Sequence, residues 1–181
     1  MIVLKNAQIR TIAAVSCVAL ALFFVAGCYT TEFPLGSADK ATVDPAYVGD
    51  FVITSDKKSE TIIIRNIDNH LYYVEWLTED DKPLRMVGYT ADVNGVTFAN
   101  LRGLTEDGTI DTKYMVLRVS ISDDHSKLSI RNLKDDFFKD KKIDSSDALQ
   151  KVIAGNLDNS EMYDGDTFVG TRIPAAPNDA K

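Results

Sequence analysis

The stretch 113-KYMVLRVSISDDHSKLSIR-131 alternates between apolar and polar residues on both sides of a short acidic segment. From Met115 to Ile121 every second residue is a large apolar side chain, and the spacing resumes at Leu128, after 123-DDHS-126. A period of two places such side chains on one face of an extended strand. Because the segment between the two runs is typical of a turn, the stretch predicts a β-hairpin.

Similar alternating segments occur before and after this hairpin. We predict further strands over residues 49–55, 61–67, 70–78, 84–92, 95–102 and 166–173. Turn-forming residues separate them, and Asn94-Gly95 is a strong hairpin signal because both residues tolerate a positive φ. Short strands that follow one another at regular spacing are typical of a barrel. The sequence therefore predicts a mainly β fold, a single antiparallel meander barrel of about eight strands.

A short helix is predicted just before the last strand. Residues Ser145 to Asp147 suit an N-terminal cap, and the apolar residues at 148, 149, 152 and 153 share roughly one helical face. Gly155 then ends the segment, so we expect a helix over 145–154.

Residues 1–27 differ in composition from the rest of the chain. Lys5 and Arg10 precede an apolar run from Ile12 to Ala26 that is interrupted by one serine. A basic start and an apolar stretch of about 15 residues are typical of a signal peptide, since a membrane span needs about 20. The alternative is an uncleaved signal-anchor helix. Cleavage would remove two basic and no acidic residues, so the formal charge would change from −7 to −9.

The apolar run ends in Val25-Ala26-Gly27-Cys28. This sequence resembles the lipobox of bacterial lipoproteins, in which an aliphatic residue and two small residues precede a cysteine. The resemblance implies that the first three residues are recognised by the signal peptidase and that cleavage precedes Cys28. It also implies that the Cys28 sulfur carries a diacylglyceryl group with palmitate-like chains, so the membrane is a partner through a lipid anchor. The implied location is the cell envelope, and Tyr29 in place of Asp favours the outer membrane if the organism is Gram-negative.

The segment after the cysteine, 29-YTTEFPLGSADKATVDPA-46, has no periodicity and is rich in Thr, Ser, Pro, Gly and charged residues. That composition predicts a linker. Eighteen flexible residues would have a root-mean-square reach of about 25 Å, enough to hold a domain clear of the lipid headgroups. Phe33 and Leu35 could instead contact the domain or the membrane. The expected division is a signal peptide at 1–27, a lipidated Cys28 with a flexible tether at 28–46, a barrel domain at 47–173 and a disordered tail at 174–181.

The start of the expected domain, Tyr47-Val48-Gly49-Asp50-Phe51, resembles the opening of lipocalin-like proteins. In that superfamily a short 3₁₀ turn leads into Gly-x-Trp on the first strand, and Phe51 stands here at the Trp position. The family aromatic closes one end of the barrel and packs against an arginine of the last strand. The resemblance therefore implies a contact between Phe51 and Arg172.

The composition argues against several classes of function. An acidic chain is repelled by phosphate, so we expect no nucleic-acid partner. Asp124, His125 and Ser126 are adjacent in one hairpin and cannot reach the geometry of a catalytic triad. With Cys28 as the single cysteine left after cleavage and with isolated histidines, a zinc site is not expected. The acidic clusters in the turns lack the order of an EF-hand. We therefore predict no enzymatic activity, no metal and no cofactor.

One face of the predicted strand at 70–78 is rich in aromatic residues and could line a pocket. The candidate lining residues are Tyr72, Val74, Trp76, Tyr89 and Phe98, with Met86 as an alternative to Tyr89. A small barrel has room either for packed side chains or for one small ligand. Two functions stay open: binding of a small hydrophobic ligand or lipid, and a structural role in which a filled barrel docks another envelope protein.

Overall fold

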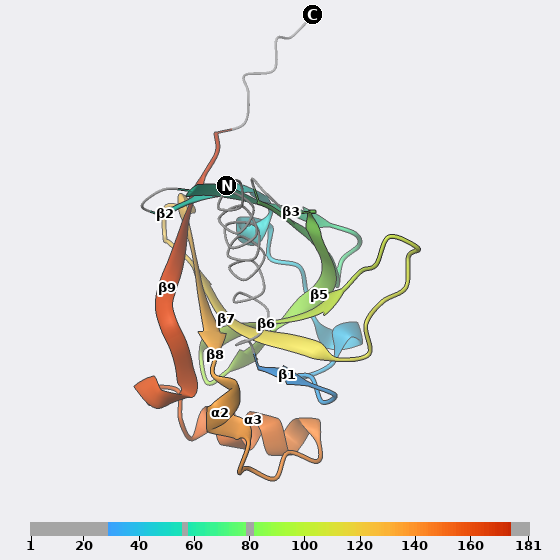
Figure 1. Ribbon diagram of the computed structural model, residues 1–181, viewed down its shortest axis with the longest axis vertical. Coiled ribbons are helices and arrows are strands. Elements are labelled where there is room, and N and C mark those ends of the chain that lie inside the picture. Colours follow the sequence, from blue (N-terminus) through green and yellow to red (C-terminus); the bar gives the residue numbers. More distant parts are fainter. Residues whose placement is uncertain (1–28, 56–57, 79–81, 175–181) are drawn as a thin grey trace, which may run out of the picture.

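The computed structural model describes residues 29–55, 58–78 and 82–174. Its strands are β1 (Thr30–Thr31), β2 (Gly49–Ser55), β3 (Lys58–Asn66), β4 (Tyr72–Leu77), β5 (Leu84–Val93), β6 (Val96–Gly103), β7 (Tyr114–Ile121), β8 (Lys127–Leu133) and β9 (Tyr163–Arg172). From β2 to β9 each strand pairs antiparallel with its neighbours in sequence, and a β2–β9 pairing closes the ring. The predicted eight-stranded meander barrel is therefore confirmed (Figure 1).

The β7–β8 hairpin forms where the alternation predicts it. Ile121 pairs with Leu128 across the two strands. The turn is held by Asp124, whose carboxylate accepts a 2.6 Å hydrogen bond from the Ser122 hydroxyl, and His125 adopts a left-handed φ of 57°. A short polar side chain that bonds the neighbouring turn residues stabilises such a conformation. This hairpin thus fixes the register between two barrel strands.

The interior of the barrel is filled by the inward faces of these strands. The buried interior residues are Tyr47, Phe51, Ile53, Ile62, Ile64, Tyr72, Val74, Met86, Ala99, Leu101, Leu117, Val119, Leu128 and Ile130. Burial of one large apolar side chain contributes about 1.5–3 kcal/mol relative to exposure. The alternation of the sequence is therefore the main source of the stability of the barrel.

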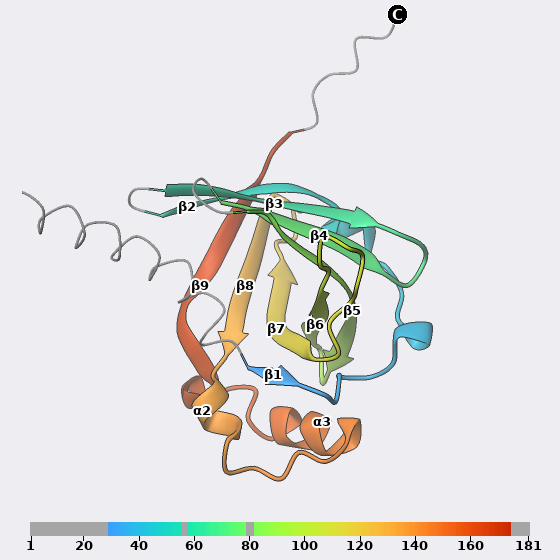
Figure 2. The same cartoon turned by 45° about the vertical axis from the view of Figure 1, so that its right-hand side comes forward.

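A second apolar cluster lies between the barrel and two helices, α2 (Asp135–Phe138) and α3 (Ser146–Ala154). Helix α3 is the predicted helix, and the Ser145 hydroxyl caps it by accepting a 3.1 Å hydrogen bond from the Ala148 amide. Leu149 and Ile153 lie one turn apart on its inner face and are fully buried. Both helices lie at one end of the barrel (Figure 2). They cover that end with an additional layer.

Residues 29–46 do not form the expected flexible tether. Strand β1 pairs with the start of β7, and the ring of Tyr29 stacks on Phe138 with a centroid distance of 4.0 Å. Leu35 has no exposed surface. Its amide donates to the Asn100 side chain at 2.7 Å, and the Asn100 amide group donates back to the Leu35 carbonyl at 3.2 Å. The scattered apolar residues of this segment show no period, but Leu35 and Ala41 are buried and Val43 packs against the interior cluster.

The expected signal peptide, the lipobox residues and the tail from residue 175 onward lie outside the described residues. Over the ranges that are described, no helix is both long enough and apolar enough to cross a membrane.

Candidate functional site

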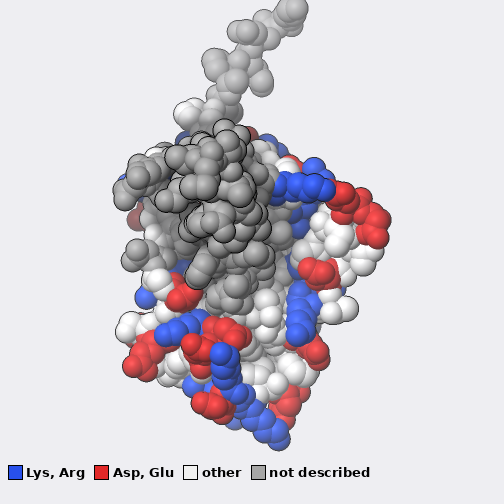
Figure 3. Space-filling view, in the orientation of Figure 1, with Lys and Arg blue, Asp and Glu red and all other residues white. Residues whose placement is uncertain are grey.

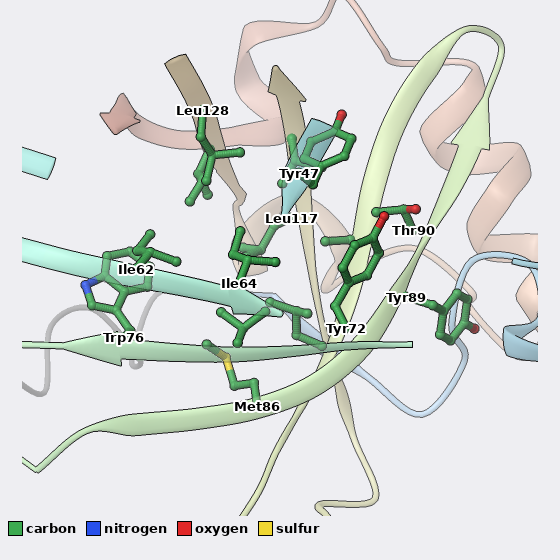
Figure 4. Close-up of a pocket in the computed structure, with 15 residues that line it drawn as sticks. Tyr47, Ile62, Ile64, Tyr72, Trp76, Met86, Tyr89, Thr90, Leu117 and Leu128 are labelled. Carbon is green, nitrogen blue, oxygen red and sulfur yellow. The ribbon is translucent and has the colours of Figure 1, made fainter. Parts of the chain in front are cut away.

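A small apolar cavity lies inside the barrel (Figure 4), with a volume of about 60 Å³. It is lined by side chains of strands β3 to β8 and of the 3₁₀ turn η2 (Pro45–Tyr47). The lining residues are Tyr47, Ile62, Ile64, Tyr72, Val74, Trp76, Met86, Tyr89, Thr90, Ala99, Leu101, Leu117, Val119, Leu128 and Ile130. Ligand pockets for drug-sized molecules are usually about 300–1,000 Å³. The side chains thus fill most of the interior.

Most of the residues expected at a pocket do meet there. Tyr72, Val74 and Trp76 line the cavity from β4. Tyr89 also contributes to the lining, although Figure 4 shows its ring apart from the other labelled side chains.

Phe98 is the candidate lining residue that lies elsewhere. Its neighbour Ala99 belongs to the interior cluster, whereas Phe98 belongs to the cluster beneath the helices. Successive residues of a strand point to opposite faces. Alternation defines two faces of a strand but does not show which one faces inward, so the sequence alone could not separate these positions.

The polar groups of Tyr72 and Trp76, the two aromatic residues of β4 that line the cavity, are hydrogen-bonded to neighbouring residues. The Tyr72 hydroxyl accepts a 2.6 Å hydrogen bond from the Asp44 amide, and the Trp76 indole donates to the Glu60 carboxylate at 2.7 Å. The rings of Trp76 and Phe168 also pack edge to face, with a centroid distance of 6.4 Å. Because these two polar groups have partners, the cavity is lined mainly by hydrophobic surface.

The expected contact between Phe51 and Arg172 is present. The two residues are paired across β2 and β9, and the guanidinium lies 4.5 Å from the centroid of the Phe51 ring. Arg172 also donates to the carbonyls of Ala46 at 2.5 Å, Val48 at 2.6 Å and His125 at 2.6 Å. Nothing in the sequence pattern pointed to these three carbonyl acceptors.

Gly49 provides the space for this guanidinium. Its φ is 156°, and a Cβ atom at this position would lie 2.1 Å from an Arg172 nitrogen. Only glycine fits there. Gly49, Phe51 and Arg172 therefore form one set of contacts, which we call the closure. It links η2, the start of β2, the last strand and the β7–β8 hairpin.

An open hollow of about 580 Å³ lies beside this closure. It is lined by Asp44, Pro45, Ala46, Ile121, His125 and Arg172. Three nitrogens of the Arg172 guanidinium already donate to backbone carbonyls, so few of its N–H donors remain free to bind a ligand in the hollow.

The residues considered for catalysis form turns. The Ser126 hydroxyl donates to the Asp124 carboxylate at 2.8 Å, an interaction that closes the hairpin. Hydrogen bonds from Ser122 and Ser126 lower the pKa of the Asp124 carboxyl, so it stays ionised. His70 Nδ1 lies 2.6 Å from the Ala41 carbonyl. Within the described ranges, no three His, Cys, Asp or Glu side chains gather as a metal-binding group.

Burial makes the tyrosines sensitive to alkaline pH. It raises the pKa of Tyr89 to about 12 from an ordinary value of 10.0, and Tyr114 adds to the effect. The neutral phenol is favoured in the folded state, so its contribution to stability is complete below pH 10 and is lost as the pH rises towards 12. We expect the free energy of unfolding in urea to fall between about pH 10 and about pH 12. Tyr89→Phe should reduce this fall, and an equal fall in both proteins would contradict the assignment to Tyr89.

Comparison with known proteins gave no relative: no family model, no curated protein and no solved structure matches this chain.

Proposed function

We propose that this chain is a lipid-anchored, non-enzymatic protein of the bacterial cell envelope whose filled barrel docks another envelope component. The lipobox-like sequence ending at Cys28 supports the anchor. The small volume of the interior cavity, about 60 Å³, is the observation that favours docking over carriage of a lipid. The resemblance to lipocalin-like proteins extends to the contact between Phe51 and Arg172. It supports a scaffold of that kind and carries no activity with it.

The anchor is tested by metabolic labelling with a radiolabelled fatty acid in a bacterial host. We expect the parent protein to incorporate label and to sediment with membranes, because two or three acyl chains hold a protein durably at a bilayer. Cys28→Ala should lose both properties. Cys17→Ala, which changes the other cysteine of the chain, is the matched control and should behave like the parent. Labelling of Cys28→Ala would overturn the proposed anchor.

Binding of a very small apolar molecule is the second candidate function, because the cavity is lined almost entirely by hydrophobic side chains. Trp76 is the single tryptophan of the chain and lines this cavity, so its fluorescence reports directly on occupancy.

We expect a fatty acid and a fluorescent apolar dye to give no saturable change in the Trp76 emission of the parent protein. Leu117→Ala is the matched variant, since Leu117 lines the cavity and its truncation enlarges it. An enlarged apolar cavity of about 150 Å³ can admit benzene, so this variant should gain binding of benzene. Saturable fatty-acid binding by the parent would favour carriage instead of docking.

A further inference from the structure

We propose that the end of the barrel formed by β1 and α2 lies directly against the membrane surface, with no spacer between the lipid anchor and the folded domain. This inference rests on the proposed lipidation of Cys28. It adds an orientation and a contact surface that the anchor alone does not specify.

The residue next to the anchor is fixed to the barrel on several sides. The Tyr29 amide donates to the Leu133 carbonyl at 3.1 Å, and the Tyr29 carbonyl accepts from the Val116 amide at 3.5 Å. Its ring stacks on Phe138 of α2. Consecutive Cα atoms are about 3.8 Å apart across a trans peptide bond. The lipidated Cys28 would therefore lie within one residue of the barrel surface.

The following residues keep this segment in place. Thr30 pairs with Met115 and Thr31 with Tyr114. Leu35 is fully buried and is held by the Asn100 side chain. A detached tether of 18 residues would reach about 25 Å, but detachment would require all of these contacts to break. The attached segment leaves the domain little freedom to move away from the headgroups.

The charge of the segment that contains α2 suits a lipid surface. Residues 134–144, KDDFFKDKKID, contain four lysines and four aspartates, so their formal charge is zero, whereas the chain without residues 1–27 carries −9. Lys139 forms ion pairs with Asp135 and Asp136, and Lys142 pairs with Asp144 at 3.1 Å. Figure 3 shows mixed basic and acidic side chains at the helical end. This segment of an otherwise acidic domain thus carries no net charge, so anionic headgroups do not repel it.

Two lysines at opposite ends of β8 provide a matched test. Lys127 begins the strand and Lys134 follows its last residue; both are exposed. The two positions are seven residue steps apart along an extended strand, which corresponds to roughly 20 Å. The lipidated full chain, with Lys127→Cys or Lys134→Cys, is labelled with an environment-sensitive thiol fluorophore. It is then reconstituted into vesicles of phosphatidylethanolamine and phosphatidylglycerol that contain a headgroup-linked nitroxide quencher.

We expect the label at position 134 to be quenched several-fold more strongly than the label at 127. Asn100→Ala, which releases Leu35, should reduce this difference. Equal and weak quenching at both positions, in protein that floats with the vesicles, would overturn the proposed orientation and leave the anchor intact.

The parent chain without an added cysteine separates the two proposals. Its Cys28 thiol should be blocked by lipid and take up no fluorophore. Labelling of the parent, or failure to float with the vesicles, would overturn the anchor and the orientation together.

Discussion

Replacing Arg172 by Ala is expected to lower the free energy of unfolding by about 3 kcal/mol. The substitution leaves the carbonyls of Ala46, Val48 and His125 without their donor and removes the cation above the Phe51 ring. Each lost hydrogen bond from a charged donor costs about 1.5–3 kcal/mol when its partner stays buried, and access of water to this part-buried site reduces the sum. Urea unfolding followed by the fluorescence of Trp76 measures the change.

Two further variants show whether the effect comes from geometry or from charge. Arg172→Lys keeps the positive charge but lacks the planar set of donors that reaches three carbonyls, so we expect an intermediate loss. Arg65→Ala removes an arginine whose ion pair with Asp50 is exposed to solvent, and it should cost less than about 1 kcal/mol. If Arg172→Ala were no more destabilising than Arg65→Ala, the closure would not contribute to the stability of the barrel.

Asn100→Ala is the second substitution with a large expected effect. It should lower the free energy of unfolding by about 2 kcal/mol, and the N-terminal segment should be the first part of the chain to lose its contacts. Asn100 has no exposed surface, and its side chain both accepts from and donates to the Leu35 backbone. Alanine would leave that amide and carbonyl buried without partners. Hydrogen exchange should show loss of protection over residues 29–41 before any loss in β2 to β9.

An exposed asparagine in the barrel provides the control for this experiment. Asn66→Ala, at the end of β3, should change stability by less than about 0.5 kcal/mol. Leu35→Ala alone should cost about 2–4 kcal/mol, and its combination with Asn100→Ala should cost less than the sum, because the two residues share one contact. Additive losses would contradict a joint role in fixing the segment.

Local sequence patterns were sufficient to predict the barrel. Alternation between Met115 and Ile121, and the turn residues that follow, depend on neighbours within a few positions, as does the cap of α3 at Ser145. A strand at 49–55 was predicted with the bounds that β2 has. The contact of Phe51 with Arg172 was also predicted, through a family resemblance and not through any local pattern.

Long-range packing decided the rest of the candidate site. The interior volume depends on how side chains from six strands and η2 meet, and no single strand carries that information. Phe98 and Ala99 are neighbours in sequence, but only the curvature of the closed sheet places Ala99 inside and Phe98 beneath the helices.

The sequence by itself determined an alternating β chain, and it contains a basic and apolar N-terminal segment that ends in Val25-Ala26-Gly27-Cys28. Tertiary structure alone decided that residues 29–46 are part of the domain. Leu35 and Asn100 are 65 positions apart, and each is unremarkable among its own neighbours. A fully buried asparagine needs hydrogen-bond partners for its side-chain amide, and here these are a backbone amide and carbonyl from a segment whose composition indicates a linker.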